Sequence, residues 1–486
     1  MTEIYVVIRG GTIATSSDIF EADVGILGES IVLVGKDLPG AARSIDARGK
    51  FVLPGGIDSH AHIEQLSASG LMTADDFDSA TTSAAFGGTT TVISFAAQHR
   101  GMNLAQVVEE YHAAAKRGAV IDHAFHMIVA DPTAETLAAI PGLVGSGHAS
   151  IKIFMTYDRI RLEDDQVLDV LAAARAAKAM VCVHAENNGM ISWLSKRLVD
   201  RGYIAPKYHT VSHPRLSEAE AFQRLIAMAE FIDQPIMIFH VSTAEGAAVV
   251  REARGRGLKV FAETCPHYLL LTAADVDKPG LEGAKWCCSP PLRTAGDQEA
   301  LWAALARRDL QVISSDHAPY AYDETGKLKH GPASTFKQIA NGLPGLEVRL
   351  PLMFDAMVSK GRMGITDFVD LTATQPAKIY GLYPRKGTIA VGADADIVIW
   401  DPARTHTISA ATQHDRTGYT PFEGRTVTGY PEIVLRRGEV IVENDKLLAK
   451  PGSGRFLGRD AGAAAEPRGV LAPEFEQALN FGAELR

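Results

Sequence analysis

The stretch Val52-Leu53-Pro54-Gly55-Gly56-Ile57-Asp58-Ser59-His60-Ala61-His62 decides the predicted fold. Its apolar run from Val52 to Ile57 leads directly into a polar tip that carries two histidines. Residues two apart on a strand project to the same face, so His60 and His62 can address one metal ion together. Taken alone, the His-x-His pattern is weak, because a pair of hydrogen-bonded core histidines is the commoner origin.

The same pattern recurs along the chain after this stretch. Apolar runs end in polar residues, and an amphipathic segment follows each run. Strands are predicted near 57–60, 90–95, 122–129, 149–155, 180–184, 236–241, 258–263 and 311–315. Helices are predicted near 75–86, 103–117, 133–140, 163–178, 217–232, 244–255, 297–306 and 346–357. Eight such pairs over roughly 250–300 residues indicate an α/β fold of the (β/α)8 barrel (TIM barrel) type. A doubly wound sheet is the alternative, although it usually has fewer repeats and needs a switch point.

One helix start can be argued from single residues. Ser217-Glu218-Ala219-Glu220 has the form of a capping box, and the apolar positions Phe222, Leu225, Ile226 and Ala229 follow it. In such a box the first side chain and the fourth satisfy each other's backbone N–H groups. The pattern therefore predicts that this helix begins at Ser217.

Both ends of the chain are predicted to be β-structure. Strands are expected at 4–8, 22–26 and 30–34, with a turn at Gly10-Gly11, and again at 387–389, 396–400, 432–435 and 439–442. The simplest organisation is a small β-sandwich domain built from residues 1–55 and 386–450. The barrel then spans 56–385, and 451–486 form a C-terminal tail that is either loose or an arm to a neighbouring subunit.

Composition limits the function classes. The chain has 486 residues, and its 48 basic and 58 acidic side chains leave a net charge of −10. This balance argues against a nucleic-acid partner or an anionic membrane surface, because phosphate binding needs clustered positive charge. No run approaches the ~18 apolar residues of a membrane span, and the first residues, MTEIYVVIRGG, do not have the basic-then-apolar pattern that predicts a secretion signal. Four cysteines, two of them adjacent, indicate reduced thiols in a soluble cytoplasmic protein.

Other strand tips strengthen the metal hypothesis. His184, His240 and Asp316 each end a predicted strand, and His317 follows Asp316. The carboxyl ends of barrel strands form the face where barrel active sites lie. Together with His60 and His62, these side chains favour a zinc-like metal site over five separate polar groups.

Lys152 stands within the apolar run Ile151-Lys152-Ile153-Phe154-Met155, in the fourth predicted barrel strand. A free ammonium buried beside metal cations would be strongly disfavoured. Two interpretations remain open on sequence spacing alone. The lysine either reaches the rim or pairs with an acid, or it adds carbon dioxide and becomes an anionic carbamate that bridges two cations.

The chain resembles the dihydropyrimidinase/D-hydantoinase family of cyclic amidohydrolases over nearly its whole length. The first motifs that carry the resemblance are Pro54-Gly55-Gly56-Ile57-Asp58, Thr73-Ala74-Asp75-Asp76-Phe77, Gly87-Gly88-Thr89-Thr90 and Ile151-Lys152-Ile153-Phe154-Met155-Thr156-Tyr157. It continues through His184-Ala185-Glu186-Asn187, His240-Val241-Ser242 and Glu263-Thr264-Cys265-Pro266-His267-Tyr268. Cys288-Ser289-Pro290-Pro291-Leu292-Arg293, Ser315-Asp316-His317-Ala318-Pro319 and Gly392-Ala393-Asp394-Ala395-Asp396 complete it.

The resemblance implies a binuclear zinc centre. The more buried ion would be held by His60, His62 and Asp316, and the more exposed ion by His184 and His240. Carboxylated Lys152 and a hydroxide would bridge the two ions. Tyr157 would donate a hydrogen bond to the amide oxygen of the substrate, while Ser289 and Asn341 present backbone groups to the ring.

The implied reaction is hydrolysis of a cyclic amide. Two cations that share a water lower its pKa towards neutrality. Asp316 would take the proton and return it to the leaving nitrogen. A dihydropyrimidine or a hydantoin would open to an N-carbamoyl amino acid. Relatives in the family commonly form homotetramers.

Particular positions of the sequence argue against three related protein classes. Dihydroorotase-like relatives place arginine two residues after the second histidine, where this chain has Glu64, whose charge would repel a substrate carboxylate. Allantoinases typically lack the tyrosine that matches Tyr157. Non-catalytic scaffold proteins of the dihydropyrimidinase-related type have lost metal ligands, whereas every ligand position is filled here. A related cyclic imidase stays open as an alternative.

Three segments depart from the family pattern, namely Ile63 to Ser69, Ala96 to Arg100 and Asp158 to Arg161. In the family these loops shape the pocket for the ring substituent. Their polar residues indicate either a more polar substituent or an imide, or they face solvent. The choice of ring and the stereoselectivity therefore stay open.

Overall fold

A computed structural model describes residues 4–67 and 70–485. Residues 1–3, 68, 69 and 486 fall in the predicted β-domain, a predicted substrate loop and the tail, and they lie outside the described residues. Eight parallel strands form one sheet in chain order: β6 (Gly56–Ala61), β7 (Thr89–Ala97), β8 (Asp122–Ile128), β9 (Ser150–Phe154), β10 (Met180–His184), β11 (Ile236–Ile238), β12 (Val260–Thr264) and β13 (Val312–Ile313).

The two ends of this sheet meet. A parallel bridge joins Ala61 to His317, and the N–H of His62 donates to the carbonyl of His317 at 2.7 Å. The strand order follows the sequence without the reversal that a doubly wound sheet requires. The predicted (β/α)8 barrel is therefore confirmed, and Lys152 lies on its fourth strand.

Each barrel strand is followed by helical structure, as predicted. The main helices are α1 (Phe77–Phe86), α2 (Leu104–Gly118), α3 (Ala134–Gly145), α4 (Asp164–Ala177), α7 (Arg215–Ile232), α8 (Ala244–Gly255), α10 (Ala295–Ala306) and α11 (Arg349–Phe354). Shorter helices are α9 (Pro266–Leu270), α12 (Ile365–Val369), α13 (Gln375–Ile379) and α14 (Gly462–Ala465). Short 3-10 or π turns are η1 (Ala273–Val276), η2 (Glu282–Trp286), η3 (Phe336–Gln338), η4 (Asp355–Ser359), η5 (Asp370–Thr374) and η6 (Pro473–Phe475).

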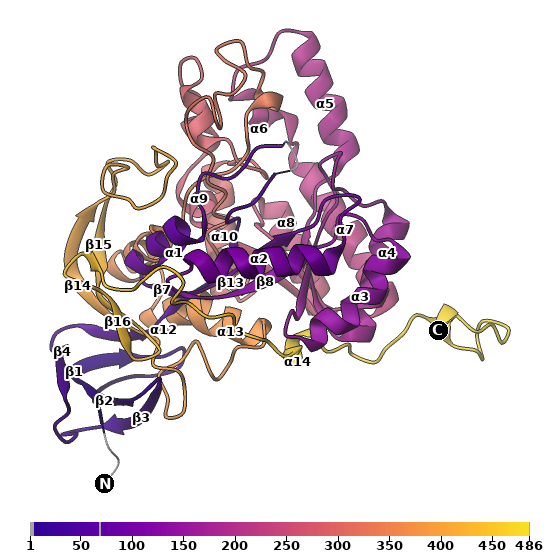
Figure 1. Cartoon of the computed structure of the whole chain (residues 1–486). Coiled ribbons are helices and arrows are strands. Elements are labelled where there is room, and N and C mark those ends of the chain that lie inside the picture. Colours follow the sequence, from indigo (N-terminus) through magenta and orange to yellow (C-terminus); the bar gives the residue numbers. More distant parts are fainter. Residues whose placement is uncertain (1–3, 68–69, 486) are drawn as a thin grey trace.

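Two further helices, α5 (Asn188–Asp200) and α6 (Tyr208–Ser212), were not predicted. They stand above the carboxyl ends of the barrel strands, at the top of the molecule in Figure 1. Among the described residues, no helix combines the length and the apolar character needed to cross a membrane.

The predicted capping box is wrong. Helix α7 begins at Arg215, two residues before Ser217, whose hydroxyl donates to the carbonyl of Pro214 at 2.7 Å. The carboxylate of Glu218 is buried and accepts the N–H groups of Ser242 and Thr243, both at 3.0 Å. The second residue of the predicted box therefore serves a tertiary contact with the loop after β11, and the fourth, Glu220, accepts from the side chain of Asn187 at 2.6 Å rather than from the start of the helix.

The two ends of the chain share a second sheet, as predicted, and Figure 1 shows their indigo and orange strands side by side. Its members are β1 (Val6–Ala14), β2 (Ile19–Leu27), β3 (Ser30–Gly35), β4 (Arg43–Asp46), β5 (Phe51–Pro54), β14 (Ile397–Thr407), β15 (Thr426–Arg436), β16 (Glu439–Glu443) and β17 (Lys446–Leu447). They form one continuous mixed sheet in which β14 pairs with β5. The predicted strand at 387–389 is absent.

Gly10 and Gly11 do not turn the chain, contrary to the prediction. Strand β1 runs straight through them, and its register with β2 shifts between Ile8 and Gly11. Gly10 has a φ of 64°, which places it in the left-handed region that glycine adopts at little cost. A Cβ on Gly11 would lie 2.4 Å from the side chain of Val52. The two glycines thus form a bulge over the neighbouring strand.

A buried ionic cluster joins the two sheets. The ammonium of Lys386 lies 2.8 Å from a carboxylate oxygen of Asp122, at the start of β8, and 2.8 Å from one of Asp396, beside β14. Burial opposes ionisation of Lys386, but Asp396, Asp122 and Asp394 outweigh it and raise its pKa. Because the lysine occupies the space between these acids, the cluster is an ion pair rather than a candidate metal site.

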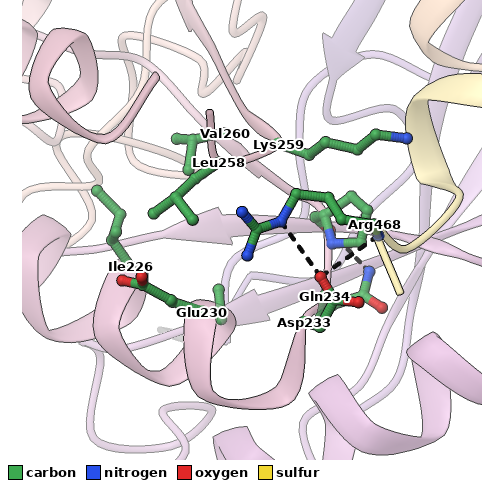
Figure 2. Close-up of a pocket in the computed structure, with 10 residues that line it drawn as sticks. Ile226, Glu230, Asp233, Gln234, Leu258, Lys259, Val260 and Arg468 are labelled. Atoms are coloured by element: carbon green, nitrogen blue, oxygen red, sulfur yellow. Dashed lines mark hydrogen bonds and ion pairs between the residues drawn. The ribbon is translucent and has the colours of Figure 1, made fainter. Parts of the chain in front are cut away.

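The C-terminal tail binds the barrel before it leaves it. Phe456 pairs with His123 of β8, and the buried guanidinium of Arg459 donates to the carbonyl of Phe125 at 2.6 Å. Further on, the carboxylate of Asp233 accepts the N–H of Gly469 at 2.7 Å. It also bonds the side chain of Arg468, as Figure 2 shows. Beyond these contacts the chain extends away from the body of the molecule (Figure 1).

Candidate metal centre and active site

An open cavity of about 930 Å³ lies at the carboxyl ends of the barrel strands. Its lining contains all nine residues that the sequence singled out: His60, His62, Lys152, Tyr157, His184, His240, Ser289, Asp316 and Asn341. They come from the ends of five strands, β6, β9, β10, β11 and β13, and from three loops that are distant in the sequence. The fold therefore brings the predicted site residues together.

Asp316 lies at the centre of the histidine cluster. One of its carboxylate oxygens is 3.1 Å from Nε2 of His60 and 3.5 Å from Nε2 of His62. Ligand atoms of His60, His240 and Asp316 all lie within 4.8 Å of one another. The rings of His184 and His240 follow, with centroids 4.3 Å apart.

The ring nitrogens that face away from the cluster are held by partners behind them. Nδ1 of His60 bonds the carboxylate of Glu263, and Nδ1 of His62 lies 2.8 Å from the amide oxygen of Gln65. Nε2 of His184 lies 2.8 Å from Glu186. Such partners fix which nitrogen of an imidazole is free to bind a metal ion.

These partners were not predicted. Glu263 could have been found, because it is an acid near a predicted strand end, the same signal that marked Asp316. Gln65 and Glu186 come from loops; Gln65 lies in the first departing segment and Glu186 in the motif His184-Ala185-Glu186-Asn187, but neither pattern assigns them a histidine partner. His213 also belongs to this group, because its Nδ1 lies 2.8 Å from the second oxygen of Glu186.

The protonation states suit a cation. Burial opposes ionisation of Asp316, but the neighbouring histidines outweigh it and hold the pKa of this carboxyl well below its usual range. Burial lowers the pKa of His62, His184 and His240, so these imidazoles are neutral near pH 7. Burial also opposes protonation of His60, but Asp316 and Glu263 raise its pKa to about 9. The neutral imidazoles of His62, His184 and His240 beside an ionised carboxylate are donors that zinc prefers, and His60 would release its proton on binding the ion.

Lys152 has neither of the ordinary partners of a buried lysine. Its side chain has no exposed surface, and Nζ makes no hydrogen bond among the described residues. The nitrogen lies 4.0 Å from the ring centroid of Phe239 and 4.8 Å from that of Phe154. Burial lowers its pKa to about 7. The interpretation that Lys152 reaches the rim or pairs with an acid is therefore wrong.

Three site residues have strained backbones. Tyr157, His240 and Asp316 have φ values of 73°, 43° and 47°, in the region that side chains other than glycine rarely adopt. Each lies just past the end of its strand. Such strain persists only where the surrounding structure imposes it, and it is concentrated at functional sites.

Tyr157 is placed as a hydrogen-bond donor over the cavity. Burial raises the pKa of its phenol well above the usual value, and its hydroxyl bonds the side chain of Ser289. The amide oxygen of Asn341 is buried without a partner among the described residues. A ligand in the cavity would therefore meet a protonated phenol and an unused acceptor.

Of the three departing loops, two reach the cavity. Gln65 and Ser67 line it from the first loop, and Ile160 lines it from the third. Arg100, in the second loop, is exposed and donates to the carbonyl of Arg161 at 3.0 Å. Some of the polar residues in these loops therefore face the cavity, while others face solvent.

Glu64 does not act as the sequence suggested. Its carboxylate lies 2.9 Å from a guanidinium nitrogen of Arg117 on α2, and Glu64 is not among the residues that line the cavity. The expected repulsion between Glu64 and a substrate carboxylate is therefore wrong. The chain nevertheless lacks the arginine that dihydroorotase-like relatives carry at this position.

The fold is a closed (β/α)8 barrel, and the four histidines and one aspartate at its strand tips form a candidate metal centre. Residues 51–441 match the amidohydrolase family, and the chain belongs to that family. It is 42% identical over 455 residues to the D-hydantoinase of Geobacillus stearothermophilus, covering 93% of this chain and 96% of that protein. The crystal structure of dihydropyrimidinase from Brevibacillus agri superposes with a TM-score of 0.91 at 40% identity, covering 94% and 99% of the two chains. The L-hydantoinase (dihydropyrimidinase) of Arthrobacter aurescens, at 28% identity, gives a TM-score of 0.85 and covers 94% and 100%.

Proposed function

We propose that this protein is a metal-dependent hydrolase that opens the ring of a dihydropyrimidine or a hydantoin to an N-carbamoyl amino acid. The observation that carries the proposal is the convergence of His60, His240 and Asp316 within 4.8 Å, in a cavity that Lys152 also lines. The relatives named D-hydantoinase and dihydropyrimidinase support the choice of substrate class.

The donor set fits two zinc ions. His60, His62 and Asp316 would hold one ion, and His184 and His240 the other. The buried Nδ1 of His240 has no hydrogen-bond partner among the described residues, which fits a role as a ligand atom. Lys152, carboxylated on Nζ, would supply two anionic oxygens between the ions, and its lowered pKa of about 7 makes the neutral amine available for that modification.

The residues of this chain divide the remaining chemistry among them. When bound, the zinc pair supplies Lewis-acid activation of water and of the amide carbonyl. Asp316 accepts the proton of the attacking water and returns it to the leaving nitrogen, as general base and then general acid. Tyr157 donates a hydrogen bond to the oxygen on which charge develops. Backbone groups of Ser289 and Asn341 orient the ring.

We further propose that the enzyme is a cytoplasmic homotetramer. The four cysteines, Cys182, Cys265, Cys287 and Cys288, are buried and unpaired, which supports a reducing compartment. The departing C-terminal segment carries the exposed apolar side chains of Leu479 and Phe481, which supports a contact with another subunit. Light scattering of the purified chain tests the number of subunits.

A panel of ring substrates tests the activity. Protein loaded with zinc is assayed for ring opening of dihydrouracil, 5-substituted hydantoins, a succinimide-type imide and allantoin. We expect turnover of dihydrouracil or a hydantoin, and none by a His60→Asn/His62→Asn double variant that stays folded. Preferred turnover of the imide would favour the cyclic imidase alternative, whereas activity that survives thorough chelation would contradict the metal mechanism.

A further inference from the structure

Beyond the residues already assigned, the cavity has a polar group of lining side chains. Gln65, Tyr320 and Lys337 come from three separate segments, after β6, after β13 and in η3. Among the described residues that line the cavity, Asp316 is the single carboxylate. A substituent on the substrate ring would meet these three side chains rather than a wholly apolar wall.

All three side chains are hydrogen-bond donors towards the cavity. The amide oxygen of Gln65 is taken by Nδ1 of His62, which leaves the NH2 group of Gln65 without a partner among the described residues. Tyr320 is buried, and its hydroxyl bonds Ser67. The oxygen of Ser67 accepts the N–H of Leu71, and where the hydroxyl of Ser67 donates to Tyr320 the phenol proton is left for a ligand.

Lys337 brings an unpaired positive charge to the same cavity. Within the described part of the chain no carboxylate pairs with its ammonium. The turn that carries it is anchored, because the neighbouring Phe336 is buried and its N–H donates to the carbonyl of Ile204 at 2.8 Å. The N–H of Thr335 also donates to the side chain of Gln338 at 2.9 Å. Lys337 is therefore positioned by the fold at the entrance of the cavity.

The acidic residue next to Gln65 does not bring its negative charge into the cavity. Glu64, the residue adjacent to Gln65, pairs with Arg117 outside the cavity. A neutral apolar substituent would leave the buried donors of Gln65 and Tyr320 without acceptors, which is costly, and would gain nothing from the exposed ammonium of Lys337. A carboxylate would accept from all three and would gain charge-assisted hydrogen bonds.

We propose that the preferred substrate is a cyclic amide whose ring carries an anionic substituent, and that Lys337, Tyr320 and Gln65 bind that anion. This inference rests on the proposed ring-opening function and specifies its substrate class. Lys337 acts here in substrate binding, and the reacting amide remains with the residues assigned above.

A pair of substrates that differ in charge alone tests the inference. Zinc-loaded protein is assayed on hydantoin with a 2-carboxyethyl group at C5 and on the analogue with a 2-carbamoylethyl group, each as both enantiomers. Unsubstituted hydantoin and dihydrouracil are assayed in parallel. We expect kcat/KM to favour the carboxylate by about fivefold or more, mainly through KM, and about 0.5 M salt to reduce this ratio.

Variants assign the effect to the lysine. Lys337→Ala should bring the ratio of the two kcat/KM values close to one, Lys337→Glu should invert it, and Tyr320→Phe should lower it. Lys329→Ala removes an exposed lysine on the same segment, outside the cavity lining, and should leave the ratio unchanged.

Two results would overturn the inference while the proposed function stands. One is a ratio of one or less in the wild type that still opens hydantoin or dihydrouracil. The other is an unchanged ratio in folded, zinc-loaded Lys337→Ala protein. If the zinc-loaded wild type opens none of the four rings, the proposed function itself fails, and this inference fails with it.

Discussion

Nδ1 of His62 lies 2.8 Å from the amide oxygen of Gln65. An amide oxygen can only accept, so Nδ1 carries the proton and Nε2 keeps its lone pair on the side of Asp316. A side chain from a loop thus selects the tautomer of a strand residue. The same loop residue contributes its NH2 group to the cavity, so it connects the metal site with the substrate site.

Replacement of Gln65 by leucine should weaken zinc binding. Loss of the acceptor frees the ring of His62 to rotate or change tautomer, and partners of this kind are typically worth about 10- to 100-fold in metal affinity. Gln65→Glu, which keeps an acceptor, should retain the affinity. Competition with a chelator measures it, and Gln477→Leu in the exposed tail is the matched control. Equal zinc affinity in Gln65→Leu and wild type would contradict the role assigned to Gln65.

The sequence predicts the ligand ring well for a physical reason. Parallel barrel strands all end on one face, so polar residues at strand tips, such as His184, His240 and Asp316, must meet. The partners behind them come from loops and helix starts, whose positions depend on tertiary packing. Glu186 and His213 are examples, and nothing in their local sequence marks the contact of 2.8 Å between them.

The same distinction applies to the fold. The barrel helices can be predicted from the periodicity of their apolar residues. Helices α5 and α6 lie between β10 and α7, where the strand–helix repeat of a barrel does not require an additional helix. The capping box at Ser217 fails because its fourth side chain, Glu220, bonds Asn187, and in the same segment the buried Glu218 serves backbone groups more than twenty positions away. Local patterns therefore place elements correctly and fail where a buried polar side chain serves a distant backbone.

Lys152→Ala should lose zinc and at least about a thousandfold in kcat, because the anionic bridge between the ions disappears. Short carboxylic acids should restore part of the activity by occupying the space that the side chain leaves. Elemental analysis and single-substrate kinetics measure both effects. The His60→Asn variant should show no such rescue, since its missing ligand is an imidazole. Full zinc content in Lys152→Ala would refute the bridging role.

Tyr157→Phe should lower kcat by about 100- to 1000-fold and change KM little, because the lost hydrogen bond acts on charge that develops during the reaction. Zinc content should stay the same. Tyr383→Phe removes an exposed phenol and should have no effect on either constant. A rise in KM at constant kcat would show instead that Tyr157 only binds the ground state.

Lys386→Met should destabilise the protein by about 3–5 kcal/mol, because it leaves the buried Asp396 without its ammonium partner and Asp122 with the guanidinium of Arg437 alone. Asp122 begins β8 of the barrel sheet, Asp396 directly precedes β14 of the second sheet, and each lies 2.8 Å from Nζ of Lys386. Loss of the ammonium should therefore separate the β-domain from the barrel. Urea unfolding measures the change. Lys446→Met, at an exposed position, should stay within about 0.5 kcal/mol of wild type.

Acid should loosen the tail through a group of buried histidines. Nε2 of His112 lies 2.9 Å from Nε2 of His148, whose Nδ1 lies 3.1 Å from the carbonyl of Leu143. This arrangement needs an unprotonated Nε2 on His148, because Nδ1 must donate to the carbonyl. The ring of Phe456, from the tail, stacks on His148 with centroids 5.0 Å apart.

Burial lowers the pKa of both His123 and His148 to about 4. Asp122 opposes this shift at His123, whereas Arg459 and His112 add to it at His148. Unfolded histidines titrate near pH 6.5, so the unfolded chain binds more protons than the folded chain between about pH 6.5 and 4. The free energy of unfolding should therefore fall as the pH is lowered through this window. His148→Gln cannot be protonated and should show a weaker dependence.

Hydrogen exchange and urea unfolding of the zinc-loaded protein at about pH 7.5 and pH 5 check this prediction. After correction for the intrinsic exchange rate at each pH, backbone amides that bind the tail, such as those of Leu457 and Arg459, should lose protection at the lower pH before those in β8. The reason is that protonated His148 would place an N–H against the N–H of His112 and would carry charge beside Arg459. Equal protection factors of these amides at the two pH values, in wild type and His148→Gln alike, would show that the histidines do not control the tail.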